Sequence, residues 1–137
     1  MSITVGVDNT AHVYDISGTT HEVSGWGGST VALNSSCVVA IKAMNVAGPM
    51  GLIAGTDSGV VTDNTWRCTT SEEVNWFSDT FNDGNWTSAH VWYDYTEGPW
   101  ASRPNIDANS KWIWSDNQND LTIFCRKQIC PGMKYLL

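Results

Sequence analysis

The sequence has few charged residues and very few basic ones. Charged side chains make up 15% of the 137 residues, and seven Lys and Arg oppose fourteen Asp and Glu, for a formal net charge of −7. Seven scattered basic residues do not form a phosphate-binding face, so the composition argues against nucleic acid as a partner. Binding to an anionic membrane surface is disfavoured for the same reason.

Long apolar runs and helical periodicity are also missing. The longest apolar runs span only a few residues, so the sequence predicts no insertion into a membrane. No window of eleven residues shows the period of an amphipathic helix. Aromatic residues, by contrast, reach 11%, and eight of them are Trp, which argues against a disordered chain.

Catalytic motifs are absent as well. The sequence contains no GxSxG, no HExxH and no Gly-rich phosphate loop. The histidines His12, His21 and His90 stand in or beside predicted strands, without a Ser or Cys in a recognisable nucleophile setting. The prediction is therefore a non-catalytic protein, while the carboxylates leave open a small glycoside hydrolase with a pair of acids.

Cysteine is present in an even number, at Cys37, Cys68, Cys125 and Cys130. These spacings contain no CxxC pair and no nearby His, which disfavours a zinc site. Two disulfides, for which three pairings exist, are favoured over four buried thiols in a cytosolic protein. Disulfides indicate an extracellular location, and glycosylation sequons at Asn34 and Asn85 fit that location.

Short alternating runs between turn residues predict an all-β fold. Gly, Asn and Asp fill the segments between the runs, because Gly tolerates positive φ and Asn and Asp bond their own backbone. This rhythm predicts one β-sandwich or jelly-roll domain over residues 1–137, with 130–137 as a flexible tail. The expected strands are 3–7, 11–16, 31–33, 38–45, 51–54, 60–62, 89–95, 111–114 and 121–128.

Two longer segments interrupt the strands. Residues 71–88 are polar and aromatic, and the acidic side chains that follow Ser71 predict a short helical turn there. Residues 96–110 contain two Pro and no alternation. Loops of that length in a compact domain are often functional, so the second segment is a candidate for ligand binding.

Tryptophan supplies candidate sugar-stacking surfaces, because its flat face packs on the C–H surface of a sugar. Trp112 and Trp114, two positions apart on one predicted strand, share a face and are predicted to pack in the core. Trp26, between glycines, and Trp100, in the Pro-containing loop, are predicted to be exposed and to contact a ligand.

Asn and Asp in turns supply candidate ligands for sugar hydroxyls or for a hard metal ion such as calcium. Asp8 and Asn9 place two side-chain oxygens together at a strand end. Asn105 and Asp107 offer further oxygens in the 96–110 loop. We therefore expect these four residues to bind ligand, with Asp8 and Asn9 also as metal ligands.

The order of motifs along residues 2–129 resembles a known family. Residues 5–14 are similar to the strand, Asp-Asn, strand hairpin of galactose-binding-domain-like jelly rolls, and residues 37–54 resemble the return that follows. The later motifs resemble those of sugar-binding jelly-roll modules attached to glycosidases and of lectin-like domains in invertebrate secreted proteins. These motifs are Thr65-Trp66-Arg67-Cys68, Trp76-Phe77, Phe81-Asn82-Asp83-Gly84-Asn85-Trp86, Trp112-Ile113-Trp114 and Phe124-Cys125-Arg126.

The resemblance implies a galactose-binding-domain-like jelly roll that binds carbohydrate through loops at one end. In the rhamnosidase-associated module of this superfamily, an Asp-Asn pair contacts calcium and sugar hydroxyls, and Asp8 and Asn9 match that pair. The resemblance also implies a Cys68–Cys125 disulfide, which leaves Cys37–Cys130 as the second bridge.

The leading hypothesis is a secreted, calcium-assisted lectin. Single shallow sugar sites bind weakly, so a lectin of this size is expected to be a homo-oligomer that gains avidity. The main alternative is an extracellular structural or matrix interaction domain without a sugar site. Burial of both Trp26 and Trp100 would favour that alternative.

Overall fold

The computed structural model describes residues 1–34, 37–100 and 103–130, so the predicted tail over 130–137 lies outside this description except for Cys130. No helix in the described part of the chain is long and apolar enough to span a membrane. The strands are β1 (Ser2–Asp8), β2 (Thr10–Tyr14), β3 (Thr20–Ser24), β4 (Ser29–Ala32), β5 (Val38–Met44), β6 (Gly51–Thr56), β7 (Arg67–Thr69), β8 (Thr87–Ser88), β9 (His90–Asp94), β10 (Lys111–Trp114) and β11 (Thr122–Gln128).

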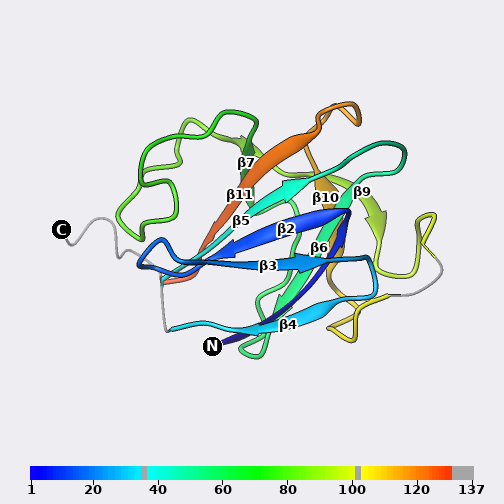
Figure 1. Ribbon diagram of the computed structural model, residues 1–137, viewed down its shortest axis with the longest axis horizontal. Helices are drawn as coiled ribbons and strands as arrows, with labels where there is room; N and C mark the ends of the chain where they lie inside the picture. Colours follow the sequence, from blue (N-terminus) through cyan, green and yellow to red (C-terminus); the bar gives the residue numbers. More distant parts are fainter. Residues whose placement is uncertain (35–36, 101–102, 131–137) are drawn as a thin grey trace.

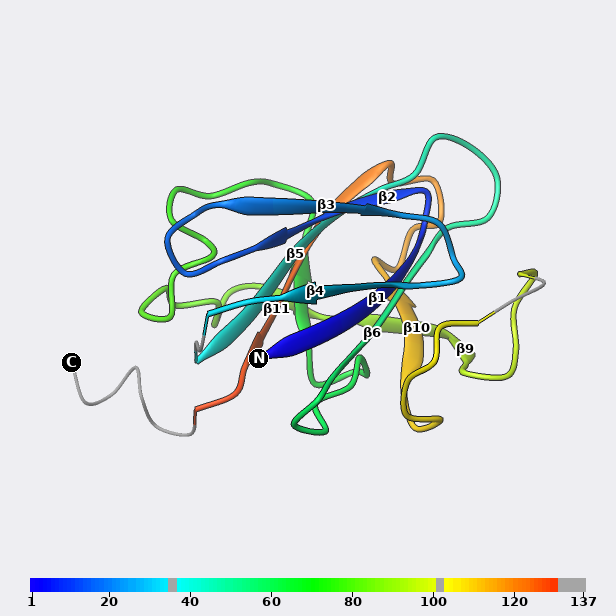
Figure 2. The same cartoon turned by 60° about the horizontal axis from the view of Figure 1, so that its bottom comes forward.

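These strands form two antiparallel sheets that pack face to face (Figures 1 and 2). The β1 sheet has the order β4-β1-β6-β10-β9, and the β2 sheet has the order β3-β2-β5-β11-β7-β8. The sequence prediction of an all-β sandwich is confirmed. Alternation explains it, because every second side chain of a strand such as β1 enters the space between the sheets.

The main core lies between the sheets, and two smaller clusters cover their outer faces. Ile53 in β6 points away from its core-facing neighbours and packs with Trp100 and Trp112. On the other sheet, Phe124 in β11 packs outward with Trp76 under the loop that follows β7. Ala40 of β5 joins the same outer cluster. Strands β5 and β6 therefore bury apolar residues on both faces, which is why they read as nearly continuous hydrophobic runs.

Trp112 and Trp114 are both fully buried, as predicted, but they do not share a face. The register between β9 and β10 shifts at Trp112 and Ile113, which marks a β-bulge. As a result Ile113 and Trp114 both join the main core, and Trp112 packs on the outer face with Trp100. The expectation of a shared face was wrong because strict alternation fails at a bulge.

Three short strands escape the sequence pattern. Strand β3 pairs with β2 at a sheet edge and buries only Val23, so its apolar signal is weak. The two- and three-residue strands β7 and β8 are too short for any period to show. Conversely, the predicted strand over 60–62 is wrong, since Val61 makes only an isolated bridge to Gly55.

The segment after Ser71 forms turns instead of the predicted helical turn. Trp76 N–H donates to the Glu73 carbonyl at 3.3 Å, and Ser78 N–H donates to the Asn75 carbonyl at 3.0 Å. Asn75 has a φ of 60°, in the left-handed region, which ends any right-handed helix at that position. The segment instead covers the outer face of the β2 sheet with aromatic side chains.

Both implied disulfides are present, Cys68–Cys125 and Cys37–Cys130. Cys68 and Cys125 are direct cross-strand partners of β7 and β11 and lie in the main core. The other bridge joins Cys37, just before β5, to Cys130, just after β11. The two bridges therefore fix β11 at its middle and just beyond its end.

Candidate functional site

One stretch of chain forms an edge of both sheets. Strand β8 pairs with β7, and two residues later β9 pairs with β10 in the opposite sheet. Ala89 lies at the crossing, where it is buried and its N–H donates to the Trp66 carbonyl at 2.8 Å. Because Ala89 points inward, Ser88 and His90 on either side of it are exposed to solvent.

A groove of about 540 Å³ runs along this crossing, and we call it the edge groove. A second hollow of about 250 Å³ shares Thr87 and Asp116 with it, so the two form a continuous polar surface. The edge groove is lined by Asn64, Thr87, Ser88, Ala89, His90, Val91 and Asp116. The second hollow adds Cys68, Thr69, Thr70, Asn85, Trp86, Ser115 and Asp120.

The polar side chains at the ends of this surface are free to bind a ligand. Asn64, Asn85 and Asp116 are all exposed, and their side chains have no hydrogen-bond partner among the described residues. Amides offer both donors and acceptors, and a carboxylate offers acceptors only. Together with the imidazole of His90, these groups suit a ligand that carries many hydroxyls.

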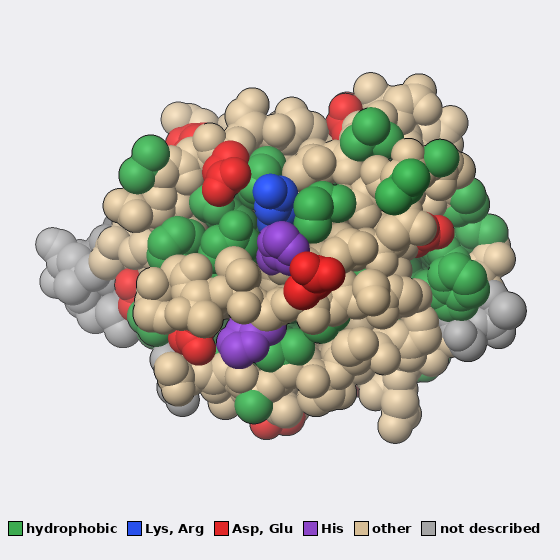
Figure 3. All heavy atoms as spheres, in the orientation of Figure 1, with side chains coloured by type: hydrophobic (Ala, Val, Ile, Leu, Met, Phe, Trp, Pro, Cys, Tyr) green, Lys and Arg blue, Asp and Glu red, His purple; other side chains and the backbone are tan. Residues whose placement is uncertain are grey.

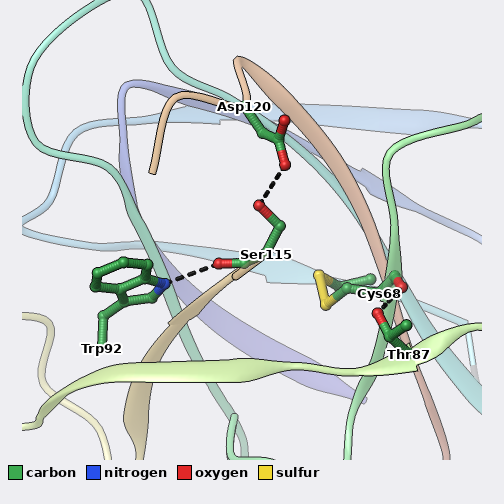
Figure 4. The surroundings of a disulfide bond; sticks show 6 residues. Cys68, Thr87, Trp92, Ser115 and Asp120 are labelled. Atoms are coloured by element: carbon green, nitrogen blue, oxygen red, sulfur yellow. Dashed lines mark hydrogen bonds between the residues drawn. A yellow bond between two sulfur atoms is a disulfide. The ribbon is translucent and has the colours of Figure 1, made fainter. Parts of the chain in front are cut away.

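Trp92 and Asp120 both form hydrogen bonds with Ser115, the residue before Asp116 (Figure 4). The Trp92 indole N–H donates to the Ser115 carbonyl at 2.8 Å, and the Ser115 hydroxyl donates to the Asp120 carboxylate at 2.6 Å. The Trp92 ring lies 4.9 Å from that of His90, so the imidazole is supported from one side. The turn that carries Asp116 is therefore held in place before any ligand arrives.

The charge of the site is negative. Asp116 and Asp120 line it, and no Lys or Arg is among the described residues that line either hollow. The protein surface as a whole is acidic, and Figure 3 shows little Lys or Arg on the face it displays. Such a site repels anions and favours neutral hydroxyl donors or cations.

The sequence-predicted residues lie elsewhere, and they do not form one site. Trp100 is only 7% exposed, so the prediction of an exposed ring was wrong. Its indole N–H donates to the carboxylate of Asp8 at 2.9 Å, and Asp8 itself is buried. The Pro-containing loop folds back onto the β1 sheet, because Trp100 and Ile106 find an apolar surface there.

Asn9 also uses its side chain within the fold. Its Oδ1 accepts a hydrogen bond from the Val46 N–H at 2.7 Å, which ties the β1–β2 turn to the loop after β5. Asp8 and Asn9 thus each have one oxygen already bonded, whereas calcium takes six to eight oxygen ligands. No group of three His, Cys, Asp or Glu side chains that could hold a metal ion occurs in the described ranges.

Trp26 is exposed, as the sequence predicted, and Asn105 and Asp107 are exposed as well. Trp26 is 40% exposed in the turn between β3 and β4. Asn105 and Asp107 line a smaller hollow of about 190 Å³ together with Asp57. With one of the two loop tryptophans exposed and the other buried, the observation that would favour the matrix domain is not met.

Sequence reasoning missed the edge groove because its residues come from unrelated segments. Asn64, His90 and Asp116 stand in separate turns and strand ends, each unremarkable by itself. Only the double edge formed by residues 87–94 brings them together. The Asn85 sequon and the polar residues after Trp114 were visible, but nothing in the sequence says that they meet.

Comparison with protein-family models, with curated proteins and with solved structures finds no match to this chain.

Proposed function

We propose that this protein is a non-catalytic carbohydrate-binding protein, a lectin, that holds neutral sugar hydroxyls in the edge groove. The observation that carries the proposal is the set of free, exposed polar side chains on a rigid surface, Asn64, Asn85 and Asp116. Carboxylate and amide oxygens accept hydrogen bonds from hydroxyls, and the absence of lining Lys and Arg from both described hollows disfavours acidic sugars.

The two disulfides agree with an oxidising, extracellular location, and we propose that the protein is secreted. An open groove of this kind gives weak single-site affinity, so the proposal includes a homo-oligomer that gains avidity. From the sequence resemblance, we also propose that the fold is a galactose-binding-domain-like jelly roll.

The test is a glycan array followed by calorimetry on the glycans that bind, with protein from a bacterial host so that Asn85 is unmodified. We expect neutral glycans to bind. Asp116→Ala should lower their affinity by about tenfold or more, since a hydrogen bond to a charged group contributes about 1.5–3 kcal/mol. Asn105→Ala, which removes an exposed polar side chain from the smaller hollow, is the control and should leave the affinity unchanged.

Two further arms separate the alternatives. Repeating the array with calcium or with a chelator tests calcium assistance, and a chromogenic glycoside tests turnover, which we expect to be absent. Silence on every glycan under both conditions would remove the lectin proposal. Loss of binding in Asn105→Ala but not in Asp116→Ala would move the site to the smaller hollow.

A further inference from the structure

Basic residues gather at one place on this acidic protein. The whole chain has seven Lys and Arg, and three of them, Arg67, Arg126 and Lys127, line a single pocket of about 190 Å³ near the end of β11. We call it the basic pocket. The remaining lining residues include Asp83 and Gln128.

Two of these cations face each other across a strand pair. Arg126 in β11 is the direct register partner of Arg67 in β7, so the two side chains share one face of the sheet. Like charges directly opposite each other destabilise a strand pair. A compensating negative charge is therefore expected nearby.

Asp83 compensates only Arg126. The Arg126 guanidinium is fully buried and donates to the Asp83 carboxylate and, at 2.7 Å, to the Ser78 carbonyl. The Phe81 ring lies 5.2 Å from it. Burial lowers the pKa of Arg126, and the Asp83 charge opposes that effect. The Asp83 carboxylate is therefore the partner that compensates the buried Arg126 charge.

Arg67 and Lys127 have no carboxylate partner among the described residues. Arg67 donates to the Trp86 carbonyl at 2.9 Å, and Lys127 donates to the Thr65 hydroxyl at 2.9 Å. Both bonds are to neutral oxygens, although the Thr65 hydroxyl in turn donates to the Asp63 carboxylate. Among the residues that line the pocket, three cations therefore face a single carboxylate, that of Asp83.

Buried polar atoms without partners gather at the same place. Arg126 Nε and both polar atoms of the Gln128 amide lack any hydrogen-bond partner within the described chain. Leaving such groups unpaired costs about 1–3 kcal/mol each, so native proteins normally supply a partner. Both residues line the basic pocket, and a bound ligand with acceptor oxygens would offer partners to the two N–H donors, Arg126 Nε and Gln128 Nε2.

We propose that the basic pocket binds one small oxyanion, a carboxylate or a sulfate group. The exposed Arg67 guanidinium matches the geometry of these anions, and Lys127 adds a second charged donor. The volume admits a single group, and the acidic surface around it repels a polyanion such as nucleic acid. The pocket is independent of the edge groove, whose lining carries the opposite charge.

The test uses the full chain, titrated with sodium sulfate and with sodium acetate at constant ionic strength set by sodium chloride. Backbone amide NMR shifts at residues 65–67 and 126–128 report binding. We expect saturable shifts with at least one of the two anions, and the tighter one identifies the group as sulfate or carboxylate.

Three glutamine variants give the decision. Arg67→Gln and Lys127→Gln should each weaken binding about tenfold, whereas Lys111→Gln, which removes the same charge on the other sheet, should not. Circular dichroism checks that each variant is folded. No saturable shift with either anion, or an equal loss in all three variants, overturns the proposal. Oxyanion binding without any glycan binding would support the basic pocket as a binding site and contradict the proposed lectin function.

Discussion

Trp100 and Asp8 are 92 positions apart in the sequence, yet the indole N–H of one donates to the buried carboxylate of the other at 2.9 Å. The Trp100 ring stacks on that of Trp112 with their centroids 4.0 Å apart. Both rings lie against Gly51, where a Cβ would come within 2.7 Å of Trp100. The loop over 96–110 is therefore fastened to the β1 sheet, and the residue that seemed suited to a sugar serves the fold.

This pair predicts an asymmetry between the two stacked tryptophans. Trp100→Phe leaves the buried Asp8 carboxylate without its donor, which costs about 1–3 kcal/mol in addition to the lost ring volume. Trp112→Phe loses the same volume but removes an indole N–H that has no acceptor among the described residues. Urea denaturation should therefore find Trp100→Phe the less stable variant. Equal stabilities would contradict a structural role for this hydrogen bond.

Thr62 links strands β6 and β10 through a buried hydroxyl. Its Oγ accepts from the Ala54 N–H at 3.1 Å and donates to the Lys111 carbonyl at 2.7 Å. Thr62→Val keeps the shape but leaves both backbone groups short of a partner, for a loss of about 1–3 kcal/mol in unfolding free energy. Thr62→Ser keeps the hydroxyl and should lose only about 1 kcal/mol. The reverse order in urea denaturation would contradict this role.

The two disulfides should differ in what their removal costs. In the chain-entropy model, bridges that span 57 and 93 residues each stabilise the fold by between about 4 and 5 kcal/mol. Replacing Cys68 and Cys125 with Ala also leaves a cavity in the main core, whereas the half-buried Cys37 and Cys130 lie at strand ends. Thermal unfolding should show the larger loss for the first pair, and an equal loss would argue against the cavity contribution.

The strands could be predicted where burial follows a simple pattern. β1, with alternating burial, and β5 and β6, buried on both faces, match their expected ranges within two residues. The edge strand β3 and the bulge at Trp112 could not be predicted, because weak burial or an extra residue erases the pattern. The disulfide pairing followed from the family resemblance, since the spacing alone allowed three pairings.

The candidate site was the part that sequence reasoning could not reach. Exposed Asn and Asp in turns mark the right chemistry, but their side chains often bond within the fold, as those of Asp8 and Asn9 do. Whether such an oxygen is free depends on contacts made far away in the sequence. Asn64 and Asp116 line one groove because the chain crosses from one sheet to the other beside them.

Tyr14 gives a prediction for alkaline pH. Its ring packs 4.8 Å from Trp76 and 5.4 Å from Phe77 on the outer face of the β2 sheet. Burial, with a smaller contribution from the Glu72 charge, raises the pKa of Tyr14 above its ordinary value of 10.0.

The sign of the pH effect follows from proton linkage. Because the unfolded chain loses the Tyr14 proton at lower pH than the folded chain does, this contribution is fully present below pH 10.0 and is lost as the pH rises toward the folded pKa. Tyr14→Phe cannot ionise there, so its unfolding free energy should fall less steeply than that of the parent over this range. Denaturation at matched pH values measures both slopes, and parallel slopes would show that Tyr14 ionises alike in the folded and unfolded chains.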